Sequence, residues 1–285
     1  EGYLHWDGDG HLMTLAPTRT GKAITTIVPN LLRYRGSCVV LDPKGELYAL
    51  TSKWRSTLGP VYRIAPFDDG TNPATANFPR HGFNPLAHIR SQADARALAE
   101  LMFPRDPRAQ AFFNNDAVTF LTAILLFVLT AAPPNRRNIG TIRQMTAKPT
   151  EVFRREVVQR MQQSPHLAVS EAANNVLGKS LGTGLPNLRD TLNSELGLWS
   201  DPALVRATDA NDVDFAELKD QTATVYLTVP FELMKPYAPF LKVVLRAALD
   251  AMLRNPKVPD IPVLFVLDEF LSLGSFLEFR DAIRT

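Results

Sequence analysis

Near its amino terminus the chain carries the stretch that decides its fold, Ala16-Pro17-Thr18-Arg19-Thr20-Gly21-Lys22-Ala23. The residue pattern predicts a short strand at 11–15 before it and a helix at 21–32 after it. Backbone N–H groups in such a turn point at a ligand near the positive end of the helix, which suits a phosphate. Lys22 is placed to reach the β- and γ-phosphates of a nucleotide, and Gly21 lets the backbone approach closely. The sequence therefore predicts a nucleotide-binding loop that uses all eight residues.

Two positions of this loop depart from the usual pattern G-x-x-x-x-G-K-[S/T]. Ala16 replaces the first glycine, and Ala23 replaces the hydroxyl residue that normally holds Mg²⁺. Because of these departures, the loop alone leaves a plain structural turn open as an alternative.

A second stretch supports the nucleotide interpretation from the far end of the chain. The apolar residues 261–267 predict a strand that ends in Asp268 and Glu269. In a phosphate-transfer site, the first carboxylate would hold Mg²⁺ and the second would polarise the attacking water. The alternative is an acidic cap on a following helix. Asp268 is therefore the predicted metal ligand, and Glu269 and Lys22 are the predicted catalytic residues.

A third motif, Asp42-Pro43-Lys44-Gly45-Glu46, follows the apolar strand predicted at 37–41. Ligands of doubly wound sheets bind at the carboxyl edge of the strands, and Pro43 and Gly45 enforce a turn there. We therefore expect Asp42 and Lys44 to face the nucleotide, together with Glu46. A turn with solvated charges is the alternative.

The order of the predicted elements indicates one α/β domain with an insertion. Strands and helices alternate in residues 1–89, which predicts a mostly parallel sheet covered on both faces. Residues 90–211 carry helical patterns without a convincing strand. The strand pattern returns in residues 212–285, with strands at 223–229 and 261–267 around a helix at 238–254. The sheet is thus expected to be interrupted by an all-helical domain.

The composition narrows the class of protein. The 285 residues are 45% hydrophobic and 21% charged, which is typical of a folded globular protein, and the net charge of +2 does not by itself indicate a nucleic-acid partner. The single cysteine, Cys38, excludes an internal disulfide and is expected to be a small buried residue. The apolar run at 117–132 is shorter than the roughly 20 residues that cross a bilayer, so a buried helix is predicted.

The motifs together resemble the TraG-like coupling ATPases of conjugation and type IV secretion. The resembling stretches, in order, are LAPTRTGK (15–22), IVPNLL (27–32), VVLDPKGELY (39–48), FNPL (83–86), TVYLTVP (224–230) and VLDEFLSLG (266–274). The resemblance covers nearly the whole chain. It implies a RecA-like P-loop domain that uses ATP and Mg²⁺, with an all-α insertion domain that helps to recognise cargo.

The resemblance also implies a setting for the protein. The family assembles as a homo-hexamer at the cytoplasmic face of the bacterial inner membrane. With other type IV secretion subunits, it drives effector proteins or relaxase–DNA complexes into the secretion channel. The family's membrane helices and its later strands with a polar sensor are not in this chain. We therefore expect a fragment that is monomeric and lacks a complete catalytic unit.

Two other functions remain open from the sequence. Ala23 favours a cargo receptor deficient in nucleotide hydrolysis, which would bind secreted effector proteins through the all-α domain. A P-loop kinase for a small molecule is the other alternative, although no stretch predicts a substrate-binding lid. The sequence does not distinguish DNA cargo from protein cargo.

Overall fold

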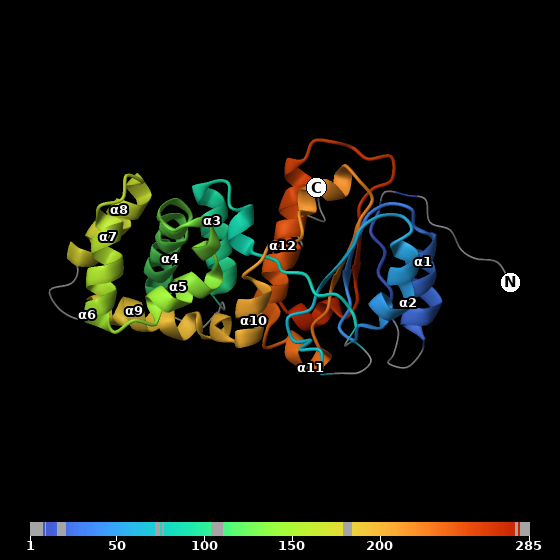
Figure 1. Cartoon of the computed structure of the whole chain (residues 1–285), viewed down its shortest axis with the longest axis horizontal. Coiled ribbons are helices and arrows are strands. Elements are labelled where there is room, and N and C mark those ends of the chain that lie inside the picture. The colour runs from blue at the N-terminus through green and yellow to red at the C-terminus, as the bar shows by residue number, and fades with distance from the viewer. Residues whose placement is uncertain are drawn as a thin grey trace.

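The computed structural model describes residues 8, 10–15, 21–71, 75, 77–103, 111–178, 184–276 and 279. Figure 1 shows layers of secondary structure stacked along the long axis of the molecule. The inserted helices, green to yellow, lie on one side of helix α12 (Ala238–Arg254), and the sheet lies on its other side with α1 and α2 beyond it. Sheet and insertion are therefore separate layers that share one helix as their border.

Four strands form one parallel sheet in the described part of the chain. They are β1 (Cys38–Leu41), β2 (Val61–Ile64), β3 (Thr224–Leu227) and β4 (Leu264–Leu267). Their spatial order is β2-β3-β1-β4, and all the pairings are parallel. Because β3 lies between β1 and β2, the chain returns from the insertion into the middle of the sheet. The predicted parallel sheet is confirmed.

Both faces of the sheet are covered, which explains why β1 and β4 are continuous apolar runs. On one face, Val39 and Leu41 belong to the large hydrophobic cluster that includes α12. On the other face, Cys38 and Val40 pack with residues of α1 (Val28–Arg33) and α2 (Glu46–Arg55). Cys38 is fully buried, as predicted.

The described residues of the insertion form helices joined by loops and contain no strand. Its helices are α3 (Gln92–Met102), α4 (Ala111–Ala131), α5 (Ile139–Thr146), α6 (Thr150–Phe153), α7 (Gln159–Gln162), α8 (Leu167–Gly178), α9 (Gly184–Glu195) and α10 (Pro202–Ala207). A π-helical turn at Arg154–Val158 joins α6 to α7. The short helix α11 (Phe231–Met234) follows β3 outside the insertion. None of the helices in the described residues is long and apolar enough to span a bilayer. The apolar run at 117–132 instead forms most of α4 and is largely buried.

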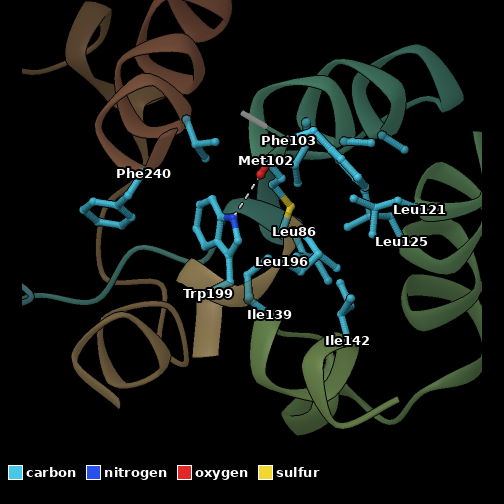
Figure 2. Packing of buried hydrophobic residues seen from close by; sticks show 14 of the residues in the cluster. Leu86, Met102, Phe103, Leu121, Leu125, Ile139, Ile142, Leu196, Trp199 and Phe240 are labelled. Atoms are coloured by element: carbon cyan, nitrogen blue, oxygen red, sulfur yellow. Dashed lines mark hydrogen bonds between the residues drawn. The ribbon is translucent and has the colours of Figure 1, made fainter. Parts of the chain in front are cut away.

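The insertion and the sheet share one hydrophobic core at α12. Trp199 is fully buried at this border, and its indole Nε1 donates a hydrogen bond of 3.4 Å to the carbonyl of Met102 at the end of α3. Its ring lies edge-on to Phe240 of α12, with 6.4 Å between the centroids. Figure 2 shows Trp199 between Phe240 and the side chains of the insertion. Packing of this kind couples the two layers.

The strand predicted at 11–15 is wrong. These residues form no strand, and Leu12, Met13 and Leu15 are 71%, 80% and 82% exposed. In the part of the chain that the structure describes, 11–15 pairs with no strand of the sheet, and β4 keeps β1 as its partner. An extended segment without such a neighbour is not stable as a strand in water.

Candidate functional site

Lys22 lies beside the two acidic residues at the end of β4. Its Nζ is 2.8 Å from Oδ1 of Asp268 and 3.9 Å from Oε1 of Glu269. Residues 246 positions apart in the chain therefore meet at one edge of the sheet. The structure brings together the three side chains that the sequence selected for catalysis and metal binding.

The topology of the sheet explains why these residues meet. β4 runs parallel to β1 with Leu267 opposite Leu41, so Asp268 and Asp42 leave the sheet at the same carboxyl edge. The helical segment that begins after Gly21 covers the face of the sheet on which Val40 and Val266 lie. Its first residue, Lys22, thereby comes to the same edge as the carboxylates.

Contact with Asp268 dominates the electrostatics of Lys22. It raises the pKa of the ammonium above its ordinary value, with a smaller contribution from the charge of Glu269, whereas burial acts in the opposite direction. The side chains of Lys22 and Asp268 are 26% and 15% exposed. A partly desolvated pair of this kind interacts more strongly than an ion pair on an open surface. Lys22 therefore stays charged at neutral pH.

The backbone of Glu269 is strained. Its φ of 57° places it in the left-handed region, and no other non-glycine residue in the described ranges has a positive φ. A residue with a Cβ adopts this conformation at a cost of about 1–2 kcal/mol. The chain then forms a short 3₁₀ helix, Phe270–Leu273, whose Leu273 is buried. The packing of this segment therefore holds Glu269 in the strained conformation.

A contact that sequence analysis missed ties the same segment to α12. Nζ of Lys242 donates a hydrogen bond of 2.6 Å to the carbonyl of Ser275, and the ammonium lies 5.9 Å from the ring centre of Phe276. No local sequence signal marks this contact, because it joins α12 to a loop 33 residues away. It links the segment after β4 to α12, the helix against which the insertion packs.

Asp42 lies at the same carboxyl edge of the sheet as Asp268, but its side chain is buried against α2. Its side chain is 1% exposed, and Oδ2 accepts a hydrogen bond of 2.8 Å from the backbone N–H of Tyr48 in α2. Gly45 precedes α2 with φ 70°, a conformation that glycine adopts without strain. Lys44 and Glu46 are exposed. The Asp42 carboxylate thus caps α2 and fixes the turn on which Lys44 stands.

Burial is the largest influence on Asp42 and raises the pKa of its carboxyl to about 6. Backbone hydrogen bonds from Tyr48, Leu47 and Gly45 act to lower this pKa, and the charge of Asp268 adds to the rise. Because folding favours the protonated form, this group stabilises the fold below about pH 4. The contribution is lost as the pH rises through about 6.

We expect Asp42→Asn to remove this pH dependence. The amide oxygen still accepts the N–H of Tyr48, but it does not ionise. Between pH 4 and pH 7, the unfolding free energy of the wild type should fall relative to that of the variant by up to about 3 kcal/mol. Urea titrations across this range measure the difference. The exposed residue Asp260 provides the control Asp260→Asn, and a constant difference between wild type and Asp42→Asn would show that the buried carboxyl does not titrate there.

The phosphate-loop prediction is only partly covered by the structure. Ala16, Pro17, Thr18, Arg19 and Thr20 lie outside the described residues. Gly21 has φ 83°, and its carbonyl accepts hydrogen bonds from both the backbone N–H and the hydroxyl of Thr25, at 2.9 and 3.0 Å. Thr25 was not selected from the sequence. A threonine four residues after the loop glycine can be recognised there as a residue that bonds the glycine carbonyl. Ala23 begins the π-helical turn Ala23–Ile27 and offers no hydroxyl.

The acidic residues fit a magnesium–nucleotide complex. Oδ1 of Asp268 is buried and its close partner in the described residues is the ammonium of Lys22, so a metal ion that displaces this ammonium would find an anionic oxygen ligand there. No cluster of three metal-binding side chains occurs in the described residues. Mg²⁺ does not need such a cluster, because proteins hold it with one or two carboxylates plus the phosphates of the ligand. Asp268 is the residue that would hold it, with the carboxylate of Glu269 beside it for the water.

Comparison with known proteins assigns the family. The family model described as Type IV secretory system Conjugative DNA transfer matches residues 1–285. The protein VirD4 of Rhizobium radiobacter is 28% identical over 294 residues, covering 99% of this chain and 41% of VirD4. The conjugal transfer protein TraG of Escherichia coli is 26% identical over 307 residues, covering 99% of this chain and 47% of TraG. The chain therefore spans less than half the length of these curated relatives.

Solved structures agree on the fold. The bacterial conjugative coupling protein TrwBdeltaN70, in its unbound form, matches with a TM-score of 0.65 at 16% identity, covering 93% of this chain and 57% of that one. The plasmid coupling protein TrwB in complex with ADP and Mg²⁺ matches with a TM-score of 0.51 at 15% identity, covering 89% and 61%. The fold is thus that of the RecA-like P-loop coupling proteins. With the family model matching from end to end, this chain belongs to the conjugative DNA transfer family of type IV secretory systems.

Proposed function

We propose that the protein containing this chain is a P-loop ATPase that couples ATP hydrolysis to the transfer of cargo into a type IV secretion channel. The observation that carries the proposal is the meeting of Lys22 with Asp268 and Glu269 at the carboxyl edge of the sheet. A cation for phosphates, a carboxylate for the metal and a second carboxylate for water are what phosphoryl transfer to water requires. TrwB, which shares the fold, has been solved with ADP and Mg²⁺.

In this proposal each residue of the site has a separate task. Lys22 binds the β- and γ-phosphates, and the backbone of residues 16–23 surrounds them. Asp268 holds Mg²⁺, which when bound neutralises the charge that develops on the phosphates. Glu269 orients and deprotonates the attacking water. Asp42 acts indirectly, because its carboxylate fixes the turn that presents Lys44 to the nucleotide.

We assign cargo recognition to the helical insertion and energy conversion to the sheet. The proposed cargo is a relaxase–DNA complex or an effector protein. The proposed working state is a homo-hexamer at the cytoplasmic face of the inner membrane, in contact with other subunits of the secretion system. Names of relatives such as "Conjugal transfer protein TraG" support the DNA alternative. Ala23 supports the hydrolysis-deficient receptor, but the complete set of Lys22, Asp268 and Glu269 favours the motor.

Conjugal transfer from living donor cells tests the proposal. A donor that carries the full-length gene with Lys22→Ala should transfer plasmid DNA or effector protein at the level of a gene deletion, while the wild-type gene restores transfer. Equal amounts of both proteins in the membrane, measured by immunoblot, are the control. Normal transfer by the Lys22→Ala donor would contradict a motor function.

Ala23→Ser should strengthen binding of magnesium–nucleotide several-fold. The serine hydroxyl returns the oxygen ligand that this loop position usually gives to Mg²⁺, and serine is close to alanine in size. Titration calorimetry with ADP in excess Mg²⁺, repeated in EDTA, measures the effect. The gain should vanish in EDTA. An equal gain under both conditions would mean that the hydroxyl contacts the nucleotide or the backbone, not the metal.

A further inference from the structure

In this structure, Lys22 contacts the carboxylate that is proposed to hold the metal ion. Its ammonium lies 2.8 Å from Oδ1 of Asp268 and 3.9 Å from Oε1 of Glu269. The same ammonium is the group that the phosphates of a nucleotide require. The proposed phosphate-binding cation and the proposed metal-binding anion are therefore partners in one ion pair.

The charges around the pair make it costly to separate one partner alone. Asp42 adds a further carboxyl whose charge interacts with Asp268. If a metal-free nucleotide drew Lys22 away, these acidic groups would lie uncompensated beside a triphosphate. Like charges that close together in a partly buried site repel strongly. Mg²⁺ alone would have to displace the ammonium without offering it another anion.

A magnesium–nucleotide complex replaces both partners in one exchange. Its phosphates would receive the ammonium, and its metal would receive Asp268 and offset the charge of Glu269. Building on the proposed ATPase function, we propose that the ion pair of Lys22 with Asp268 and Glu269 is an exchange gate, which admits magnesium-bound nucleotide and excludes metal-free nucleotide.

Two further observations support the gate. Glu269 is held in a left-handed backbone conformation next to a packed segment, which fixes the position of its Cα beside the ion pair, and its Oε1 lies 3.9 Å from Nζ of Lys22. The loop also has Ala23 where a hydroxyl usually assists the metal. Asp268, the proposed metal ligand, is thus paired with Lys22, and the lysine must leave before the carboxylate can bind a metal.

Equilibrium binding of a fluorescent ADP, with excess Mg²⁺ or with EDTA, tests the gate. Wild-type protein should bind the magnesium form at least 100-fold more tightly than the metal-free form. Asp268→Asn removes the charge but keeps the shape, so it should bind metal-free ADP at least tenfold more tightly than wild type does. Glu269→Gln should give a smaller gain of the same sign, because its oxygen lies farther from Lys22.

Asp250→Asn is the matched control, since Asp250 forms an ion pair with Arg246 on α12. It should bind like wild type in both conditions, and thermal melts establish that each variant folds. Should Asp268→Asn not fold, the Glu269→Gln result decides alone. If neither variant gains affinity for metal-free ADP, the gate is wrong while the ATPase proposal stands. If wild type binds ADP in neither condition, the ATPase proposal fails and the gate fails with it.

Discussion

Replacing Lys22 with alanine is expected to lower ATP turnover by the full-length protein at least tenfold, and by about 10²–10³ if the lysine acts mainly in the transition state. The ammonium is the positive charge closest to Asp268 among the described contacts, and its pKa is raised, so it is charged at working pH. In the transition state it would face the charge that spreads over the γ-phosphate oxygens. Alanine leaves that charge without its partner.

The measurement is steady-state phosphate release at saturating magnesium–ATP. Lys53→Ala, on the exposed side of α2, is the matched control and should retain wild-type turnover. Lys22→Arg should also be impaired, because a planar guanidinium does not take the place of a compact ammonium. Equal rates for wild type and Lys22→Ala would remove the motor function, whatever the family resemblance.

Trp199→Ala is expected to destabilise the fold by about 3–5 kcal/mol, a large part of the 5–15 kcal/mol typical of a domain. The indole is fully buried between α12 and the insertion. Truncation removes its contact with Phe240, leaves a cavity, and deprives the carbonyl of Met102 of a donor. Each of these losses falls on the border between the two layers.

Trp54→Ala gives a control within the same chain. Trp54 is 39% exposed on α2 and has Arg35 5.4 Å from its ring centre. Its removal should cost about 1 kcal/mol or less. Urea unfolding followed by circular dichroism compares the two variants. Similar losses for both would mean that the border around Trp199 contributes no more than the surface does.

The hydrophobic core that continues across α12 connects the insertion with the acidic end of β4. Nζ of Lys242 bonds to the segment after Glu269, and the opposite end of α12 joins α3 through the ion pair of Arg254 with Asp94. A helix held at both ends in this way connects the acidic end of β4 with the first helix of the insertion. The boundaries at 90 and 211 stay a prediction, because the hydrophobic cluster runs through them.

The sequence by itself determined the parts that depend on local patterns. Apolar runs and turn residues predicted the parallel strands, the helix at 238–254 with its observed bounds, and the strand-free region between β2 and β3. The motifs around Lys22 and Asp268 were visible because loops that bind phosphate and metal need particular residues at fixed spacing. The resemblance to the coupling proteins rested on the same short stretches.

Only the tertiary structure decided what depends on residues far apart in the chain. It put β3 between β1 and β2, turned Asp42 onto α2, and buried Trp199 against Phe240. It also left 11–15 without a partner strand and held Glu269 in the left-handed region. Strand order and side-chain direction follow from which surfaces pack together, and a local pattern of residues carries no record of its distant partners.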